Sequence, residues 1–346
     1  MKKWAQKCFA ALATFTLGAQ LAAPAVHAEV DKSQELVIYS NSASNGRGEW
    51  ITEKAAEAGY KIRVVDIAGA ELTDRLIGEK NNAVADMFFG LNTIEYEKLK
   101  KENLLAKYEP TWKADVDMSL GDAEGYYYPI AVQPLVLIGT DKTTMPSDWT
   151  DLIKDEYKGK YGIAGLNGGT SKTILASILA RYKDDAGELN VSQEGWDLVK
   201  AYVQNAIVYA KGQDYITELL DEKNPLTYSM MWGSGVLQNE KERSVKFNVM
   251  TPEIGEPFVT EQAAVISTSK KAELAQDFIN WLGSDKIQAE WSKKFGTIPA
   301  NKKALEAATP EVKEFAAKTK PQQLDWKFIG EHIDSWVEKV ELEFMH

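Results

Sequence analysis

Three β-rich runs decide the fold of this chain: ELVIY at residues 35–39, KIRVVDI at 61–67 and ADMFF at 85–89. A stretch with helical spacing follows each run, at 50–59, 71–80 and 93–102. This alternation predicts a parallel sheet covered by helices, because each return to a parallel strand needs a crossover that a helix supplies. The first part of the chain is therefore expected to have an α/β fold.

A second series of strands and helices follows. Apolar runs predict strands at 135–138, 161–164, 207–209 and 226–231, and helical spacing predicts helices at 171–183, 194–205, 215–222 and 236–241. A chain of 346 residues is too long for one compact core. Two domains are therefore expected.

The charge and the cysteine count exclude several classes of function. The formal net charge is −11, and removing the three lysines of the leader described below takes it to −14. Nucleic acid and anionic membranes are therefore not expected partners. Cys8 is the only cysteine and lies in the leader, and His332 and His346 are the only histidines beyond it. Disulfides, cysteine nucleophiles, cysteine zinc sites and most histidine-dependent triads are excluded.

The N-terminus has the pattern of a cleaved secretory signal. Residues 1–7 are basic, residues 9–21 are mostly apolar, and AVHA at 25–28 predicts cleavage after Ala28. The apolar run is too short for a membrane anchor, which needs about 20 strongly apolar residues. The mature protein is therefore expected in the periplasm or outside the cell, with no direct membrane insertion, and the periplasm is the favoured location.

Five loops that end a strand and open a helix are the candidate binding segments. In open α/β sheets, ligands bind beyond the carboxyl ends of the strands. Ser, Thr and Asn cap helices, and Gly exposes backbone N–H groups, which together with the helix dipole favour an anion. The alternative is that each loop is only a cap and a turn. The candidate residues are Ser42, Ser44, Asn45, Gly69, Ala70, Asn92, Gly168, Gly169, Thr170, Ser171, Trp232 and Ser234.

Five segments, in this order and spacing, carry a resemblance to a known family. They are LVIYS at 36–40, LIGEKNNAVADMFFG at 76–90, PSDWTDL at 146–152, YKGK at 157–160 and KAELAQDFINWL at 271–282. Over essentially the whole chain after the leader, the sequence resembles the periplasmic solute-binding proteins of ABC importers. The group that it resembles contains ferric-iron, thiamine, polyamine, phosphonate and sugar-phosphate binders.

The resemblance implies a two-lobed α/β fold, similar to type II periplasmic binding proteins, with the ligand cleft between the lobes. Extended crossovers join the lobes in this family, and here they would be 126–132 and 251–264. The expected division is residues 34–132 plus 258–300 for lobe 1 and 133–257 plus 301–346 for lobe 2. The implied partners are a small-molecule ligand and an inner-membrane ABC permease, and the protein is expected to be a monomer.

Departures from the family's patterns narrow the choice of solute. Polyamine binders place aromatic residues in the cleft, and the loop at 40–48 has none. Ferric binders present an adjacent tyrosine pair after the strand that here reads YSMMWGSG at 228–235, and that pair is missing. The three tyrosines at 126–128 are an alternative source of phenolates, of which at most two can share one face of a strand. Thiamine binders use a carboxylate where this chain has Asn92.

The candidate loops therefore offer mainly hydroxyls, amides and backbone N–H groups to a solute, with Arg47 and Lys172 near two helix starts. Such groups suit an oxyanion. Trp232 could cover an apolar or sugar face, and Glu261 on the return crossover could accept ligand hydroxyls; packing and surface roles are the alternatives for both. We therefore expect a periplasmic binding protein for a small polar solute with a phosphate or phosphonate group, with no cofactor and no metal site. Ferric iron is the alternative ligand.

A secreted hydrolase is the remote alternative. STSK at 267–270 matches the Ser-x-x-Lys pattern, but no partner motif accompanies it and so short a pattern is frequent by chance. The sequence contains no Gly-x-Ser-x-Gly, phosphate-loop or metal-ligand motif. We therefore expect a binding protein and not an enzyme.

Overall fold

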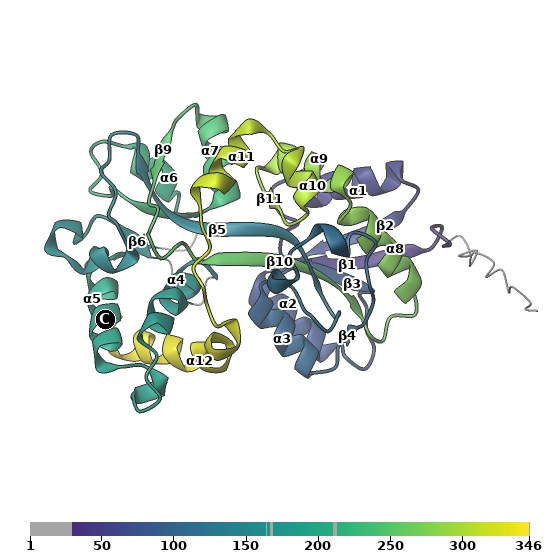
Figure 1. Ribbon diagram of the computed structural model, residues 1–346, viewed down its shortest axis with the longest axis horizontal. Coiled ribbons are helices and arrows are strands. Elements are labelled where there is room, and N and C mark those ends of the chain that lie inside the picture. The colour runs from purple at the N-terminus through teal and green to yellow at the C-terminus, as the bar shows by residue number, and fades with distance from the viewer. Residues whose placement is uncertain (1–29, 164, 167–168, 210–212, 346) are drawn as a thin grey trace, which may run out of the picture. The chain divides into compact units, whose positions relative to one another are not determined.

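The structure, a computed structural model, describes residues 30–345 except 164, 167–168 and 210–212. β1 (Glu35–Ser40) lies between β2 (Lys61–Asp66) and β3 (Met87–Gly90) and runs parallel to both. Helices cover both faces of this sheet, which explains why β1 is apolar along nearly its whole length (Figure 1). The helices between these strands are α1 (Arg47–Glu57) and α2 (Gly69–Gly78), and α3 (Thr93–Lys101) follows β3.

Two long strands continue the sheet beyond β3. β10 (Phe258–Ile266) pairs antiparallel with β3 and with β5 (Tyr128–Thr140), and the strand order is β11-β5-β10-β3-β1-β2. The short strands β4 (Leu105–Ala106) and β11 (Ile298–Pro299) pair with β10 and β5. The sheet is therefore mixed, with its parallel part at β1, β2 and β3.

β5 corrects the prediction of a crossover at 126–132 followed by a separate strand at 135–138. It is one strand of 13 residues, whose first half pairs with β10 and whose second half pairs with β8 (Ser229–Trp232) and β9 (Phe247–Val249). Pro134 does not break the strand because it stands opposite Phe258, where the ladder with β10 begins, so its missing N–H falls at a ladder end. A single strand thus passes from one half of the fold into the other.

Among the described residues, each lobe has a hydrophobic core cluster of its own. The first gathers Tyr39, Phe88, Tyr96 and Leu99 beside the parallel sheet. The second surrounds Trp149, Tyr161, Ile174, Trp196 and Trp336. The residue boundaries predicted for the lobes remain predictions, and the predicted leader lies outside the described residues.

The remaining elements lie around these cores. β6 (Gly162–Ile163) and β7 (Ile207–Val208) form a separate parallel pair, and α12 (Trp326–Glu343) packs Phe328, Ile333 and Trp336 into the second core. The other helices are α4 (Gly169–Leu179), α5 (Gln193–Asn205), α6 (Tyr215–Leu220), α7 (Gly233–Arg243), α8 (Ala272–Leu282), α9 (Asp285–Phe295), α10 (Lys302–Glu306) and α11 (Pro310–Lys318). Short 3-10 turns connect several of them.

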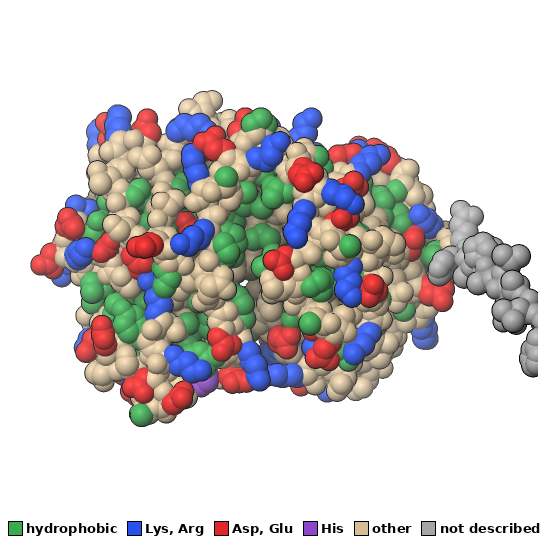
Figure 2. Space-filling view, viewed as in Figure 1, with side chains coloured by type: hydrophobic (Ala, Val, Ile, Leu, Met, Phe, Trp, Pro, Cys, Tyr) green, Lys and Arg blue, Asp and Glu red, His purple; other side chains and the backbone are tan. Residues whose placement is uncertain are grey.

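The surface carries both charge signs. Figure 2 shows Lys and Arg side chains interspersed with Asp and Glu side chains over the visible face. In the part of the chain that the structure describes, no helix has the length and apolar character needed to cross a bilayer.

Candidate functional site

A cavity of about 300 Å³ opens where the ends of β1 and β3, the starts of α4 and α7, and the strands β5 and β10 meet. Its lining has two parts. We call the part formed by loops and helix starts the loop wall: Asn41, Ser42, Ser44, Arg47, Leu91, Asn92, Gly169, Thr170, Thr173, Trp232 and Ser234. We call the part formed by the two long strands the strand wall: Gln133, Val259 and Glu261.

The loops after β1 and β3 are locked to one another. The side-chain Oδ1 of Asn41 accepts a 2.6 Å hydrogen bond from the backbone N–H of Leu91. Gly90 has φ +95°, and a Cβ at this position would lie 2.2 Å from Asn41 Oδ1 and 3.0 Å from Ser42 Oγ. Glycine is therefore required at position 90, for its backbone conformation and for the close approach of the two loops.

Arg47 contributes a positive charge to the loop wall. Asn45 and Gly46 adopt left-handed conformations, with φ of 56° and 78°, and α1 begins directly after them at Arg47. The Arg47 guanidinium carbon lies 5.2 Å from the centre of the Phe295 ring. Among the described residues no carboxylate forms an ion pair with Arg47 and no hydrogen bond engages its guanidinium. The N–H donors of this side chain remain free for a solute.

Three helices present their N-terminal ends to the cavity. Asn92 caps α3, with its Oδ1 accepting from the backbone N–H of Glu95 at 3.1 Å. Gly169 and Thr170 form the first residues of α4, and Ser234 is the second residue of α7. The first N–H groups of a helix have no partner within the helix, so these ends offer a favourable dipole to an anion, and they offer hydrogen-bond donors where a side chain such as Asn92 or Gln133 does not already accept.

The strand wall lies on one face of the β5–β10 ladder. Val259 stands directly opposite Gln133, and Glu261 is two residues farther along β10, so all three side chains share that face. Gln133 Nε2 donates to Glu261 Oε1 at 3.1 Å, and Gln133 Oε1 accepts a long 3.4 Å bond from the backbone N–H of Ser234. Glu261 has no ion-pair partner among the residues that the structure describes.

The tyrosines considered as phenolate donors do not line the cavity. Tyr127 is buried and donates to Glu97 Oε1 at 2.5 Å, and Tyr128 is buried and donates to the Tyr108 carbonyl at 2.5 Å. Burial raises the pKa of Tyr128 to about 12, and burial and the Glu97 carboxylate raise the pKa of Tyr127 further. The Tyr126 ring packs against Lys100 and Lys107. None of the three supplies a phenolate to this cavity.

Most of the residues predicted from the loops are brought together in the cavity wall. Two predicted residues do not line the cavity: Asn45 is exposed, and Gly69 lies where an added Cβ would be 3.3 Å from Asn41 Nδ2. Ser171 is buried in α4, and its hydroxyl has no hydrogen-bond partner among the described residues. Ala70 belongs to α2, but its side chain is not among those described, and Gly168 lies outside the described residues. Lys172 pairs with Asp334 at 3.0 Å, away from the cavity.

Six lining residues were not among the predicted site residues, and one of them, Arg47, had been noted only as lying near a helix start. Asn41 stands in a loop that the sequence pointed to, and Thr173 lies one helical turn after Thr170, so both were within reach of sequence reasoning. Leu91 follows Gly90 in another such loop. Gln133 and Val259 lie within extended strands, where neither a glycine nor a helix start marks them.

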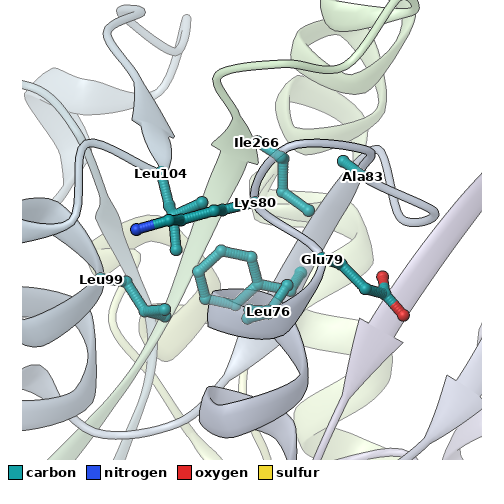
Figure 3. Close-up of a pocket in the computed structure, with 8 residues that line it drawn as sticks. Leu76, Glu79, Lys80, Ala83, Leu99, Leu104 and Ile266 are labelled. Carbon is teal, nitrogen blue, oxygen red and sulfur yellow. The ribbon is translucent and has the colours of Figure 1, made fainter.

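A second, smaller cavity lies beneath α2 and α3. Its lining is mainly apolar, including Leu76, Phe88, Leu99 and Leu104, and Glu79 and Lys80 are its charged members (Figure 3). Its volume of about 10 Å³ leaves no room for a solute. Within the described ranges, no group of three or more His, Cys, Asp or Glu side chains is placed to hold a metal ion.

The model of the bacterial extracellular solute-binding protein family matches residues 82–332, most of the chain. This chain belongs to that family. A solute-binding protein of Sinorhizobium fredii, described as a probable ABC transporter periplasmic-binding protein y4fP, is 34% identical over 312 residues, which cover 89% of this chain and 86% of the relative. The Fe(3+)-binding periplasmic protein of Serratia marcescens is 22% identical over 258 residues, which cover 72% of this chain and 73% of the relative.

Solved structures of solute-binding proteins share the fold. The ferric binding protein from Campylobacter jejuni matches with a TM-score of 0.75 at 23% identity, covering 89% of this chain and 98% of that one. Iron-bound HitA from Pseudomonas aeruginosa matches with a TM-score of 0.76 at 18% identity, covering 88% and 99%. The predicted two-lobed α/β fold and the resemblance to ABC-importer binding proteins are confirmed. The chain is a periplasmic solute-binding protein of the ABC type.

Proposed function

We propose that this solute-binding protein delivers a small solute bearing a phosphate or phosphonate group to an ABC importer. The observation that carries the proposal is the loop wall, where Arg47, which forms no ion pair with any described residue, meets the N-terminal ends of α3, α4 and α7. Guanidinium and backbone N–H donors match the several acceptor oxygens of a phosphoryl or phosphonyl group.

The rest of the cavity suits an organic group attached to the anion. Trp232 offers an aromatic face that can cover an apolar or sugar surface. Glu261 lies on the strand wall, where its carboxylate can accept hydrogen bonds from hydroxyls. A free phosphate ion would leave this part of the cavity unused, so we favour an organic phosphate or phosphonate.

Ferric iron is the second candidate, because several relatives and structural neighbours are described as ferric-binding proteins. The cavity of this chain favours it less. Glu261 is the only anionic side chain among the lining residues, and the nearby helix starts and Arg47 repel a trivalent cation.

We also propose that the protein binds its solute without converting it. In the Ser-x-x-Lys segment, Ser267 donates to the Asn103 carbonyl at 2.9 Å and Ser269 donates to Asp86 Oδ1 at 2.8 Å. Neither serine lines the cavity, so the Ser-x-x-Lys segment supplies no nucleophile to a solute there.

The mechanism that we propose is closure of one lobe onto the other around the crossing strands β5 and β10. A solute held by groups from both lobes favours the closed form, which an ABC permease then recognises. We further propose that the protein acts as a monomer in the periplasm after cleavage of the leader following Ala28, and intact-mass measurement of secreted protein tests that cleavage.

Mass spectrometry of the compound released on denaturation, followed by thermal-shift titrations, tests the ligand. The probes are glucose 6-phosphate, methylphosphonate, inorganic phosphate and ferric citrate. Ligand at a hundredfold excess over Kd contributes about 2.7 kcal/mol, so an organic phosphate or phosphonate should raise Tm saturably, with no effect of a strong chelator. The protein should compact in solution scattering as it binds. Stabilisation by ferric citrate alone, lost on chelation, would contradict the proposal.

A further inference from the structure

Gln133 occupies a special place in the fold, at the point where β5 exchanges one partner strand for another. Gln133 and Pro134 stand opposite Val259 and Phe258 of β10, and the next residue, Leu135, stands opposite Trp232 of β8. The Gln133 side chain is 6% exposed and faces the cavity wall. A group at this position touches both halves of the fold.

The hydrogen bonds of Gln133 fix the orientation of its amide. Its Nε2 lies 3.1 Å from Glu261 Oε1, and its Oε1 lies 3.4 Å from the backbone N–H of Ser234. An ionised carboxylate can only accept and a backbone N–H can only donate, so the amide must turn its NH₂ towards Glu261 and its oxygen towards α7. An ionised carboxylate has no donor and an apolar side chain has neither donor nor acceptor, so neither could serve both partners.

This arrangement keeps one carboxylate in an anion-attracting cavity without a cation beside it. Of the lining residues only Arg47 and Glu261 carry charge, and Glu261 forms no ion pair with any described residue. Tyr96, the buried titratable group behind β10, donates its hydroxyl to the Gln262 carbonyl at 2.7 Å. Gln133 is thus the side chain that directs the Glu261 carboxylate.

We propose that Gln133 is a positioning residue that holds the Glu261 carboxylate as an acceptor for a donor group of the solute and ties it to the start of α7. One carboxylate oxygen is engaged by Gln133, and the other is available to a hydroxyl or amine on the solute. Binding of the solute by Glu261 is thereby linked, through Gln133, to the point where β5 passes from one lobe to the other. The role in binding rests on the proposed function, whereas the contact itself does not.

The first test needs no ligand: Tm is measured from pH 5 to pH 8 for wild type, Gln133→Glu, Gln133→Met and the exchange Gln133→Glu/Glu261→Gln. Two adjacent carboxyls repel when both are ionised and share a proton at lower pH. Gln133→Glu should therefore lose several degrees at pH 8 and regain most of them at pH 5. Gln133→Met should show a constant loss, and the exchange should remove the pH dependence because it restores an amide–carboxylate pair.

If the difference in Tm between Gln133→Glu and wild type stayed constant over this pH range, the proposal that Gln133 positions the Glu261 carboxylate would be wrong. If Gln133→Glu does not fold, a double-mutant cycle of Gln133→Met with Glu261→Gln tests the contact instead. A coupling free energy of zero between the two substitutions would show that Gln133 does not position Glu261.

The second test measures the affinity of wild type and Gln133→Met for glucose 6-phosphate and for methylphosphonate, which has no hydroxyl or amine. Loss of a positioned acceptor should weaken glucose 6-phosphate about tenfold and leave methylphosphonate nearly unchanged. An equal loss for both probes, or no loss for either, overturns the role in binding. If wild type binds neither probe, the proposed function fails, and the ligand-free measurements still decide the contact.

Discussion

The two walls of the cavity differ in chemistry and in origin. The loop wall is made of side chains and N–H groups at the ends of elements, and it offers mainly donors and one positive charge. The strand wall is made of three residues within continuous strands, and it offers an acceptor and an apolar surface. Loops can change their residues without disturbing the sheet, whereas Gln133 and Glu261 are built into the ladder that joins the lobes. We infer that the loop wall selects the anion and the strand wall selects what the anion is attached to.

Gly169→Asp should produce the largest effect, because it places a negative charge at the first residue of α4 on the loop wall. A Cβ at Gly169 meets no atom within 4 Å, so the side chain fits without strain. A juxtaposed like charge costs several kcal/mol, which corresponds to a loss of about 100-fold or more in affinity for an anion. Tm of the unliganded protein should be unchanged or slightly higher, because aspartate is favourable at a helix N-terminus.

Gly169→Asn is the matched control, since it adds the same volume without the charge. Calorimetry with the anionic solute should separate the two variants clearly. Equal affinities for the aspartate and asparagine variants would remove the start of α4 from the anion site.

Arg47→Gln should have the next largest effect on affinity. Hydrogen bonds to charged groups contribute about 1.5–3 kcal/mol, so removing the guanidinium should weaken anion binding roughly 10- to 100-fold. Arg47→Lys keeps the charge but loses the planar fork and should bind with intermediate affinity. Titrations at low and high salt should show a smaller salt dependence for Arg47→Gln than for wild type. An unchanged affinity for an organic phosphate would place the anion elsewhere in the cavity.

The parallel part of the fold was predictable from the sequence because its signals are local. The runs at 35–39, 61–67 and 85–89 became β1, β2 and β3, with only small shifts at their ends. The continuity of β5 was not predictable, because it depends on which distant strands pair on either side of Pro134. The two-residue strands β4 and β11 are too short to leave any periodicity.

The same distinction holds for the candidate site. Ser42, Asn92, Gly169 and Ser234 could be found because a general rule places ligands at the carboxyl ends of strands, and each of these residues lies in the loop or helix start that follows a strand. Gln133 carries no such mark. Its place in the cavity depends on the register between β5 and β10, which decides the face to which it points, and register is a property of the folded chain.

Gly90→Ala should affect the loop wall less strongly and in an indirect way. The added Cβ would lie 2.2 Å from Asn41 Oδ1 in a backbone with φ +95°, so the loops after β1 and β3 must move apart. A strained backbone of this kind costs about 1–3 kcal/mol, so Tm should fall by several degrees and affinity by a smaller factor than for Arg47→Gln.

Gly59→Ala provides the comparison, because Gly59 has a similar φ of +84° but nothing within 4 Å of its Cβ. Its conformational cost should lower Tm without changing affinity. If both alanine variants bind the solute like wild type, the contact between Asn41 and Leu91 is not needed to shape the loop wall.

Glu256→Gln should have the smallest effect on binding and distinguishes the carboxylate of Glu256, two residues before β10, from that of Glu261 within the strand. Glu256 is 1% exposed, accepts from the backbone N–H of Lys320 at 3.1 Å, and does not line the cavity. Burial raises the pKa of Glu256 from 4.5 to about 7. Between these values the folded state retains a proton that the unfolded state has released, so this group makes stability fall as pH rises from about 4.5 to 7.

Glutamine cannot ionise, so Glu256→Gln should lack this decline. Between pH 4.5 and pH 7 the variant should therefore lose less stability than wild type does. Its affinity for the solute should be unchanged, because Glu261 is untouched. Thermal unfolding across this pH range and calorimetry at pH 7 test both statements, and a variant that kept the wild-type pH slope would show that Glu256 does not titrate in this way.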